Sequence, residues 1–411
     1  MRRTAAAALA AAATLLTVPN QAQARDCPDA VGAQAAIVIE ASTGIVACQR
    51  QADKRLAIGS TTKLMTALVT LENAKLSETF TAADYRPLPI ESQIRLEPGE
   101  RMKVSDLMRG LLLESGNDAA VTLAEGVSGS RKAFVREMNR RARQLGLENT
   151  RFANPIGLDD EDNYSSARDL VKLAAVLREN AFFTKIVDSP SGTLKTGNHP
   201  RTFRNRNKLV GRYPWVNGVK TGHTRGAGYV LVGSGRRNGI QLISAVLGTA
   251  SEAARDNDTM ALLNYAIPKF QRIRAVVEGK TMATAQIRDR AGATLSLAPD
   301  RTVRRIIERG KRDEVKVTVD APDVVEGPIR SGQRLGRVEV RQDGTLVATV
   351  ALVAKSAVPA PTPAQKAKTW AARPWVIGGI GVALVATVLI VTRRARTSRR
   401  RPSRREASAA S

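Results

Sequence analysis

Apolar residues form two pairs of short runs that predict β-hairpins. The first pair is Ala35 to Glu40 and Gly44 to Cys48, joined by the turn Ala41-Ser-Thr-Gly44. The second pair is Tyr229 to Ser234 and Ile240 to Leu247, with Arg236-Arg-Asn-Gly239 between them. Asn-Gly between two apolar runs is a strong hairpin signal, because both residues tolerate the positive φ angles of a tight turn.

Between and after these hairpins, apolar residues recur at helical spacing. We expect helices over residues 104–113, 119–127, 131–145, 167–178 and 255–265. Ser105 is placed to cap the first of these helices, and Ser165 or Ser166 the fourth. Strands at both ends with helices between them predict that the two hairpins share one antiparallel sheet covered by helices. This is an α+β fold over residues 25–267.

The stretch from Ile58 to Leu71 predicts one further helix, apolar on most sides and therefore buried. Ser60 and Lys63 lie in its first turn, three residues apart and hence on one face. Burying a hydroxyl and an amine is costly unless they are paired or used. A desolvated lysine loses its proton more readily, and a neutral amine can act as base for a serine. The helix N-terminus adds free N–H groups that would stabilise an oxyanion.

The spacing of these two residues matches the S-x-x-K motif of serine acyl-enzymes. On its own the motif is weak evidence, because it arises by chance about once in a chain of this length. A capped core helix with an exposed lysine is the simpler interpretation of this motif taken alone.

From Pro268 the pattern changes to short β-rich runs. They are Val315 to Val319, Arg337 to Arg341 and Leu346 to Val353, separated by turns such as Gln342-Asp-Gly344. These runs predict a small all-β sandwich over residues 268–353. Residues 354–374, with Pro359, Pro361 and Pro363, predict an extended linker.

Both ends of the chain indicate export and membrane anchoring. Residues 1–24 have the basic start, the apolar stretch and the Ala22-Gln-Ala24 cleavage site of a signal peptide. Residues 375–392 are uncharged, which predicts a single transmembrane helix. The Arg-rich residues 393–411 follow it and would face the cytoplasm, leaving the body of the protein outside the cell membrane. A plain stop-transfer signal accounts for this tail; binding to anionic lipid or to a cytoplasmic partner is the alternative.

Composition narrows the range of functions. The net charge of +26 would suit a nucleic-acid partner, but the densest basic run follows the apolar segment instead of lying on a folded module, so we expect none. In an exported chain, Cys27 and Cys48 predict a disulfide, with two free thiols as the alternative. Two histidines do not make a zinc site, so we expect neither a metal nor a cofactor.

Two further motifs give weight to Ser60 and Lys63. Ser115-Gly-Asn117 lies at a break between predicted helices, where a polar pair in an apolar setting requires a reason. Lys220-Thr-Gly222 precedes the strand that begins at Tyr229. The order S-x-x-K, S-x-N, K-T-G in an exported chain is strong evidence, although each motif alone is weak.

Over roughly residues 33–353 the chain resembles the low-molecular-weight penicillin-binding proteins, the D-alanyl-D-alanine carboxypeptidases of serine peptidase family S11. The resemblance implies a β-lactamase/transpeptidase-like domain followed by that family's second, β-rich domain. Two departures from the family are Asn163, where histidine is expected before Tyr-Ser, and an anchor that would span the membrane instead of lying on it. The stretches that carry the resemblance are Ser60 to Thr66, Leu112 to Ala119, Asn154 to Leu158, Tyr164 to Asp169 and Val216 to Thr224.

The resemblance implies roles for the motif residues. Ser60 would attack the carbonyl of the penultimate D-alanine, and Lys63 would accept its proton. Ser115 would pass a proton to the leaving amine, and Asn117 would orient Lys63 and the substrate amide.

The remaining implied residues bind substrate. The Lys220-Thr221-Gly222 motif would hold the terminal carboxylate, and Arg255 either assists it or forms a surface ion pair. The backbone N–H groups of Ser60 and His223 would form the oxyanion hole. The other histidine, His199, is expected at the surface.

The resulting prediction is a membrane-anchored serine carboxypeptidase that removes the terminal D-alanine from peptidoglycan stem pentapeptides and binds β-lactams. A β-lactamase or an endopeptidase of the same fold is the enzymatic alternative. A wall-binding scaffold or β-lactam sensor is the non-catalytic one, although such a protein gains nothing from Lys63 and Lys220.

Overall fold

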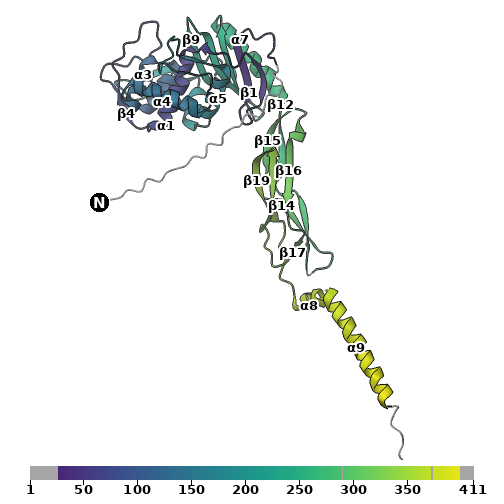
Figure 1. The fold of residues 1–411 in the computed structure, drawn as a ribbon. Coiled ribbons are helices and arrows are strands. Elements are labelled where there is room, and N and C mark those ends of the chain that lie inside the picture. Colours follow the sequence, from purple (N-terminus) through teal and green to yellow (C-terminus); the bar gives the residue numbers. More distant parts are fainter. Residues whose placement is uncertain (1–25, 289, 372–373, 399–411) are drawn as a thin grey trace, which may run out of the picture. The chain divides into compact units, whose positions relative to one another are not determined.

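The computed structural model describes residues 26–288, 290–371 and 374–398 (Figure 1). The predicted signal peptide and residues 399–411 of the predicted tail lie outside the described residues. Of the described residues, those up to Ile273, together with Ile306–Arg312, form one compact unit. The described residues of Arg274–Arg305 and those from Asp313 onward form a second unit.

The first unit is built on a five-stranded antiparallel sheet in the order β2-β1-β11-β10-β9. The N-terminal hairpin pairs with the C-terminal one through β1 and β11, with Ala35 opposite Leu247. This confirms the predicted shared sheet. The tight turn between β10 and β11 has the predicted Asn-Gly pair, with φ angles of 54° at Asn238 and 77° at Gly239. The strands are β1 (Ala35–Glu40), β2 (Val46–Arg50), β9 (Val216–Thr224), β10 (Gly228–Arg237) and β11 (Ile240–Thr249).

Helices cover both faces of this sheet, so every residue of β1 is buried. Alternate residues of β1 join different cores: Ile37 belongs to the core that contains residues of α1, α3 and α5, and Val38 belongs to the core that contains residues of α7. Figure 1 shows α3, α4 and α5 on one side of the sheet and α7 on the other. The helices are α1 (Lys63–Asn73), α2 (Val104–Arg109), α3 (Asn117–Ser128), α4 (Arg131–Gln144), α5 (Ala167–Arg178), α6 (Ala181–Val187) and α7 (Glu252–Ala266).

Two predicted helix starts had different outcomes. Ser166 caps α5, because its side chain accepts a hydrogen bond from the backbone N–H of Asp169 at 3.2 Å. The predicted cap at Ser105 is wrong, since α2 begins at Val104 and Lys103 precedes it without a side-chain cap. Helix α6 was not predicted; it begins at Ala181, and the side chain of Asn180 caps it by accepting hydrogen bonds from two backbone N–H groups.

The structure also contains a disulfide and several short two-stranded sheets. A disulfide joins Cys27 to Cys48 in β2, with the two Cα atoms 4.9 Å apart. The short strands are β3 (Leu56–Ala57) with β6 (Tyr164–Ser165), β4 (Thr79–Thr81) with β5 (Arg101–Lys103), β7 (Ser191–Leu194) with β8 (Arg201–Arg204), and β12 (Phe270–Val276) with β15 (Val303–Glu308).

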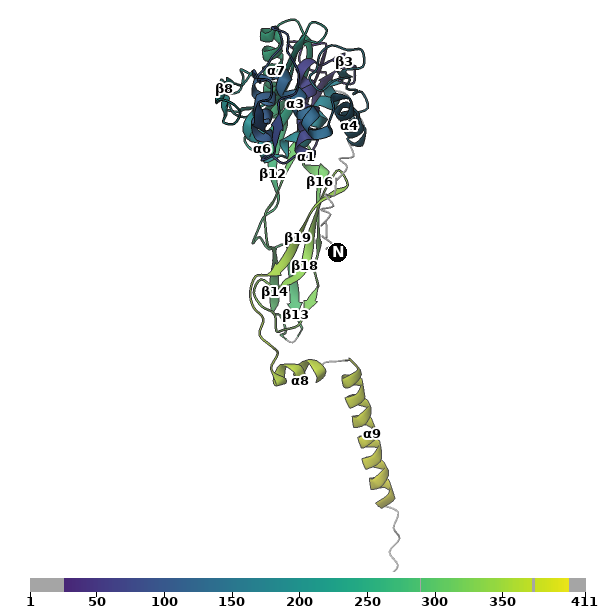
Figure 2. The same cartoon turned by 90° about the vertical axis from the view of Figure 1, so that its left-hand side faces the viewer.

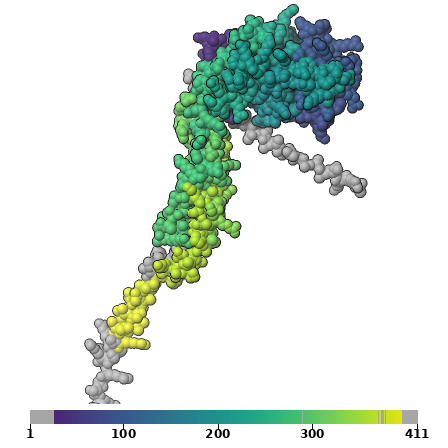
Figure 3. Space-filling model, turned by 180° about the vertical axis from the view of Figure 1, so that it is seen from behind, coloured from purple at the N-terminus to yellow at the C-terminus, as the bar shows by residue number. Residues whose placement is uncertain are grey.

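The second unit is β-rich, as predicted, and hydrogen bonds join its strands into one six-stranded sheet in the order β16-β18-β19-β14-β13-β17. Figure 2 shows β13, β14, β18 and β19 side by side, and the unit is coloured green to yellow-green in Figure 3. Buried Leu297, Val338 and Leu352 belong to its core. The strands are β13 (Ala283–Ile287), β14 (Thr294–Pro299), β16 (Val315–Asp320), β17 (Val324–Val325), β18 (Arg334–Gln342) and β19 (Thr345–Ala354).

The residues after strand β19 differ from prediction. The linker predicted to be extended contains the helix α8 (Pro363–Ala371), which begins at a proline, a residue well suited to the first helical position. Helix α9 (Pro374–Ser398) follows. Within the described parts of the chain, no helix is long and apolar enough to cross a membrane. The structure therefore does not support the transmembrane helix expected over residues 375–392.

Candidate active site

Ser60 lies in a short 3₁₀ turn, Gly59–Thr62, that leads directly into α1. The helix predicted from Ile58 therefore starts at Lys63, with Ser60 one turn before it. The turn packs against the backbone of β9, and a Cβ added at Gly59 would lie 2.9 Å from the backbone nitrogen of His223. Gly59 also has a φ of +52°, which favours glycine.

Lys63 is completely buried and donates hydrogen bonds to three oxygens. Its Nζ lies 3.0 Å from Ser60 Oγ, 2.6 Å from Asn117 Oδ1 and 2.5 Å from the carbonyl of Ile156. Burial lowers the pKa of Lys63 well below its usual value, and the positive charge of Lys220 lowers it further. A lysine with a lowered pKa and within hydrogen-bond distance of a serine hydroxyl is suited to act as its base.

Ser115 follows a π-helical turn, Gly110–Glu114, that interrupts the helical segment between α2 and α3. It adopts a left-handed backbone conformation with a φ of 67°, which is uncommon outside glycine and is found at functional sites. Its hydroxyl is buried and accepts a hydrogen bond from Lys220 Nζ at 2.9 Å. The break in helical pattern predicted at this motif is therefore present.

Lys220 lies within strand β9, which is at the edge of the five-stranded sheet. The sequence placed it ahead of the hairpin strand and missed β9. The side chain is buried and donates to Ser115 Oγ and to the carbonyl of Thr221, both at 2.9 Å. Burial, aided by the charges of Arg206 and Arg255, lowers its pKa to about 7.

Gly222 brings β9 close to the nucleophile. A Cβ at this position would meet the carbonyl oxygen of Ile58 at 2.6 Å and the backbone nitrogen of Ser60 at 3.2 Å. The adjacent His223 has an exposed side chain whose ring lies 4.1 Å from that of Tyr229. The backbones of the 3₁₀ turn and of β9 are therefore close neighbours, as an oxyanion hole shared between them requires.

Arg255 lies in α7 and is buried. Its guanidinium pairs with Asp256 at 2.7 Å and with Glu252 at 3.1 Å. These pairs hold the guanidinium, yet its charge still lowers the pKa of Lys220. The other histidine, His199, is exposed.

The structure adds site residues that the sequence did not reveal. Glu91 accepts a hydrogen bond from Asn117 Nδ2 at 2.6 Å and another from the Tyr85 hydroxyl. Asn163, at the position where the family resemblance predicted histidine, is buried and donates to Thr62 Oγ1 at 3.3 Å. In the sequence, the one feature that distinguishes Glu91 is that it is the only acidic residue between Tyr85 and Leu96.

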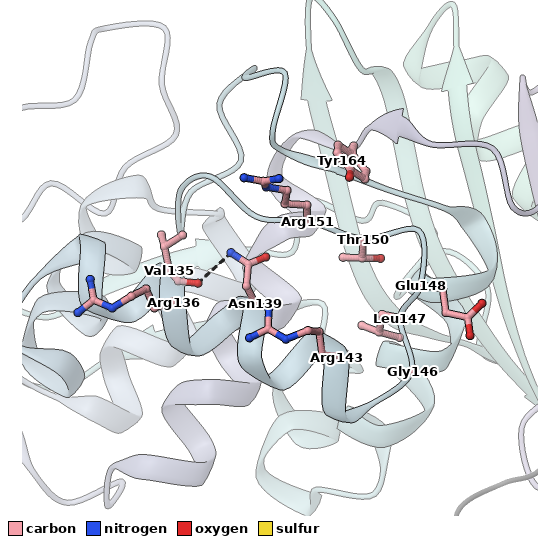
Figure 4. Close-up of a pocket in the computed structure, with 10 residues that line it drawn as sticks. All are labelled: Val135, Arg136, Asn139, Arg143, Gly146, Leu147, Glu148, Thr150, Arg151 and Tyr164. Atoms are coloured by element: carbon pink, nitrogen blue, oxygen red, sulfur yellow. Dashed lines mark hydrogen bonds between the residues drawn. The ribbon is translucent and has the colours of Figure 1, made fainter.

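A separate open hollow of about 710 Å³ lies beside α4 and the loop that follows it (Figure 4). Three arginines, Arg136, Arg143 and Arg151, line it together with Tyr164. None of the predicted site residues is among its described lining residues. Among the described residues, no three His, Cys, Asp or Glu side chains are grouped closely enough to hold a metal ion.

Two serine–lysine pairs thus converge: Ser60 with Lys63, and Ser115 with Lys220, while Asn117 contacts Lys63. Together with the helix-covered antiparallel sheet, this arrangement has the geometry that a serine acyl-transfer enzyme with a lysine base requires. Comparison with known proteins narrows this class. Residues 20–251 match the family described as D-alanyl-D-alanine carboxypeptidase, and residues 270–360 match the C-terminal domain of penicillin-binding protein 5.

Individual relatives agree with these matches. D-alanyl-D-alanine carboxypeptidase DacF of Bacillus subtilis is 32% identical over 330 residues, covering 79% of this chain and 85% of the relative. DacA of Escherichia coli is 32% identical over 351 residues, covering 80% and 84%. The crystal structure of penicillin-binding protein 5 from Haemophilus influenzae is 30% identical, with a TM-score of 0.59, and covers 81% of this chain and 99% of that one. The chain belongs to the D-alanyl-D-alanine carboxypeptidase family, which confirms the predicted resemblance and the predicted class of enzyme.

Proposed function

We propose that the protein removes the terminal D-alanine from peptidoglycan stem pentapeptides through an acyl-enzyme on Ser60. The observation that carries this proposal is the 3.0 Å distance between Ser60 Oγ and the Nζ of a fully buried Lys63. Membership of the family supports the choice of a D-alanyl-D-alanine substrate.

In the acylation step, neutral Lys63 takes the proton of the Ser60 hydroxyl as Oγ attacks the carbonyl carbon of the penultimate D-alanine. The backbone N–H groups of Ser60 and His223 stabilise the oxyanion of the tetrahedral intermediate. The carbon–nitrogen bond then breaks, and the proton that Lys63 took is delivered through Ser115 to the amine of the terminal D-alanine, which leaves Lys63 neutral again. In deacylation, water gives a proton to Lys63 as its oxygen attacks the ester carbonyl. The ester bond then breaks, Lys63 returns that proton to Ser60 Oγ, and the shortened peptide leaves with a new carboxyl group.

The terminal carboxylate is bound by protonated Lys220 and the hydroxyl of Thr221, a charge-assisted pairing. Gly222 lets the substrate-binding strand approach the nucleophile. The charge of Arg255 reaches Lys220, whose pKa it lowers. Its guanidinium is paired with Glu252 and Asp256 of its own helix, so Arg255 assists the carboxylate site through its charge.

Covalent labelling by a β-lactam tests this proposal. Intact-mass measurement of the purified protein after incubation with benzylpenicillin is expected to show one adduct, absent from Ser60→Ala, and only the parent protein is expected to release D-alanine from a soluble pentapeptide. An unlabelled parent protein, or an adduct that survives Ser60→Ala, contradicts the role of Ser60. Fast turnover of penicillin without an adduct favours a β-lactamase. Cleavage of cross-linked dimers without release of D-alanine from the pentapeptide favours an endopeptidase.

We further propose that the apolar residues 375–392 attach the protein to the cell membrane with its catalytic unit outside. The support is the absence of charge over this segment, and exposed apolar side chains of α9 such as Val382, Leu384 and Leu389. Full-length protein is expected to stay with membranes at high salt, and a chain ending at residue 360 to be released. Recovery of the full-length chain in the wash would contradict attachment, and protease access to the tail in sealed vesicles separates a spanning segment from one lying on the surface.

A further inference from the structure

The buried amide of Asn117 joins Lys63 to a carboxylate that the acyl-transfer steps do not use. Its Oδ1 accepts from Lys63 Nζ at 2.6 Å, while its Nδ2 donates to Glu91 Oε2 at 2.6 Å. The Tyr85 hydroxyl donates to the same carboxylate oxygen, and the backbone N–H of Leu88 donates to Oε1 at 3.2 Å. Both oxygens of Glu91 are therefore engaged.

We propose that Glu91 is a positioning residue of this site: it holds the Asn117 amide with its oxygen toward Lys63, and it places a negative charge beside the buried amine. The inference rests on the proposed role of Lys63 as the base. It concerns a residue that lies outside the S-x-x-K, S-x-N and K-T-G motifs.

The orienting part follows from hydrogen-bond chemistry. An ionised carboxylate only accepts hydrogen bonds, so the NH₂ group of Asn117 must face Glu91 and the oxygen must face Lys63. A flipped amide would place its oxygen against the carboxylate and its NH₂ against the lysine, losing both bonds. A neutral amide in place of Glu91 both donates and accepts, so it would allow either orientation.

Glu91 is held in its ionised form. Burial opposes ionisation, but the hydrogen bonds from Tyr85, Asn117 and the Leu88 backbone, together with the charge of Lys63, outweigh burial and lower the pKa of Glu91 below its usual value. Arg131 lies over the ring of Tyr85, 5.3 Å from its centre, and pairs with Glu125 at 2.8 Å.

The charge of Glu91 opposes the two influences that lower the pKa of Lys63. Burial and the charge of Lys220 both lower the pKa of Lys63, whereas Glu91 and then Asp118 raise it. Asp118 is committed to backbone N–H groups of Ile94 and Leu96, at 2.9 and 3.0 Å. A base whose pKa falls far below the working pH abstracts protons weakly. Glu91 therefore keeps the amine basic enough to take the Ser60 proton.

The sign of the expected effect is definite. Removing the charge of Glu91 destabilises protonated Lys63, lowers its pKa, and makes the neutral amine available at lower pH. The acid limb of the pH profile for β-lactam acylation is therefore expected to move to lower pH in Glu91→Gln, by about one pH unit. The plateau rate is expected to fall about tenfold, because the Asn117 amide loses its preferred orientation.

Two companion variants separate this role from mere support of the loop. Glu91→Asp keeps the charge, so its acid limb is expected to stay within a few tenths of a unit of that of the parent protein, whatever its plateau rate. Asp84→Asn removes a carboxylate from the same loop, exposed and without a described side-chain contact to the site, and is expected to leave both limb and plateau unchanged.

The measurement is the second-order rate of acylation by benzylpenicillin between about pH 5 and pH 9, with the melting temperature of each variant as a check on folding. An unmoved acid limb in Glu91→Gln, with or without a lower rate, overturns the inference. So does an equal shift in Asp84→Asn. If the parent protein itself is not acylated at Ser60, the proposed function fails first, which distinguishes the two results.

Discussion

The buried amine of Lys220 leads to a sharp prediction about pH. In the proposed mechanism this lysine binds the substrate carboxylate in its protonated form, and its pKa in the free enzyme is about 7, chiefly because it is buried. The pH dependence of kcat/KM reports the ionisation of groups in the free enzyme. Activity on a D-alanyl-D-alanine peptide is therefore expected to decline as the pH rises through about 7.

The size of this decline follows from the ionisation equilibrium. At pH 9, about two units above the pKa, roughly 1% of Lys220 remains protonated, so kcat/KM is expected to be about one hundredth of its plateau. This ratio corresponds to about 2.7 kcal/mol of lost transition-state stabilisation. Binding of the carboxylate raises the pKa of Lys220, so kcat at saturating substrate should decline only at higher pH.

Release of D-alanine from a soluble pentapeptide between about pH 6 and pH 10 measures both parameters. Lys220→Arg keeps the positive charge at every pH in this range, so its basic limb is expected to disappear even if the larger side chain lowers the plateau. Lys220→Met removes the charge and should give uniformly low kcat/KM. A parent profile that is flat to pH 9, or a basic limb that persists in Lys220→Arg, refutes the reasoning.

Three other substitutions and one control variant test the structure more broadly, by urea unfolding of the purified protein and, for the two glycine variants, also by the rate of D-alanine release. Cys48→Ser removes the disulfide and is expected to lower the unfolding free energy by about 3 kcal/mol relative to the oxidised parent protein. When the parent protein is reduced as well, the substitution is expected to leave the unfolding free energy unchanged. Gly157→Ala would place its Cβ 2.1 Å from a backbone oxygen of the turn that holds the nucleophile; a loss of about 1–3 kcal/mol and a tenfold or greater fall in kcat are expected. Gly129→Ala has a similar positive φ but open space, so unchanged activity there is the control. Arg201→Ala leaves the buried carboxylate of Glu100, its partner at 2.7 Å, without an ion pair, and should lower the unfolding free energy by about 3–5 kcal/mol. Much of this loss should be regained when both residues are made apolar. A loss below about 1 kcal/mol contradicts this prediction.

Local patterns predicted the parts of the fold whose contacts are close in sequence. The Asn238-Gly239 turn, the cap at Ser166 and the approach of Lys63 to Ser60 each depend on residues within four positions of one another. Helical spacing brings Ser60 and Lys63 together without tertiary information. The convergence of Ser115 with Lys220 spans 105 residues, and only the family resemblance predicted it.

Strand β9 and the contact of Glu91 were not predicted from the sequence, and each omission has a physical cause. Strand β9 lacks a clear apolar alternation, because its small and polar residues include Gly218, Lys220 and Gly222, so it did not stand out as a strand. Glu91 lies in a segment with no regular secondary structure, and its contact with Asn117 is between residues 26 positions apart. Neither periodicity nor motif spacing reports such a contact. From the sequence, this segment could be predicted only as a loop that connects secondary-structure elements.

Three glycines surround the nucleophile where backbone meets backbone: Gly59, Gly157 and Gly222. The location of Ser60 is therefore determined by main-chain contacts that any added methyl group would disturb. Natural variants that escape β-lactams cannot begin by shifting the nucleophile at these positions without also losing the enzyme. Selection under antibiotic pressure is expected to act first on exposed side chains of the neighbouring loop, such as Leu88 and Ile90, and not on Glu91.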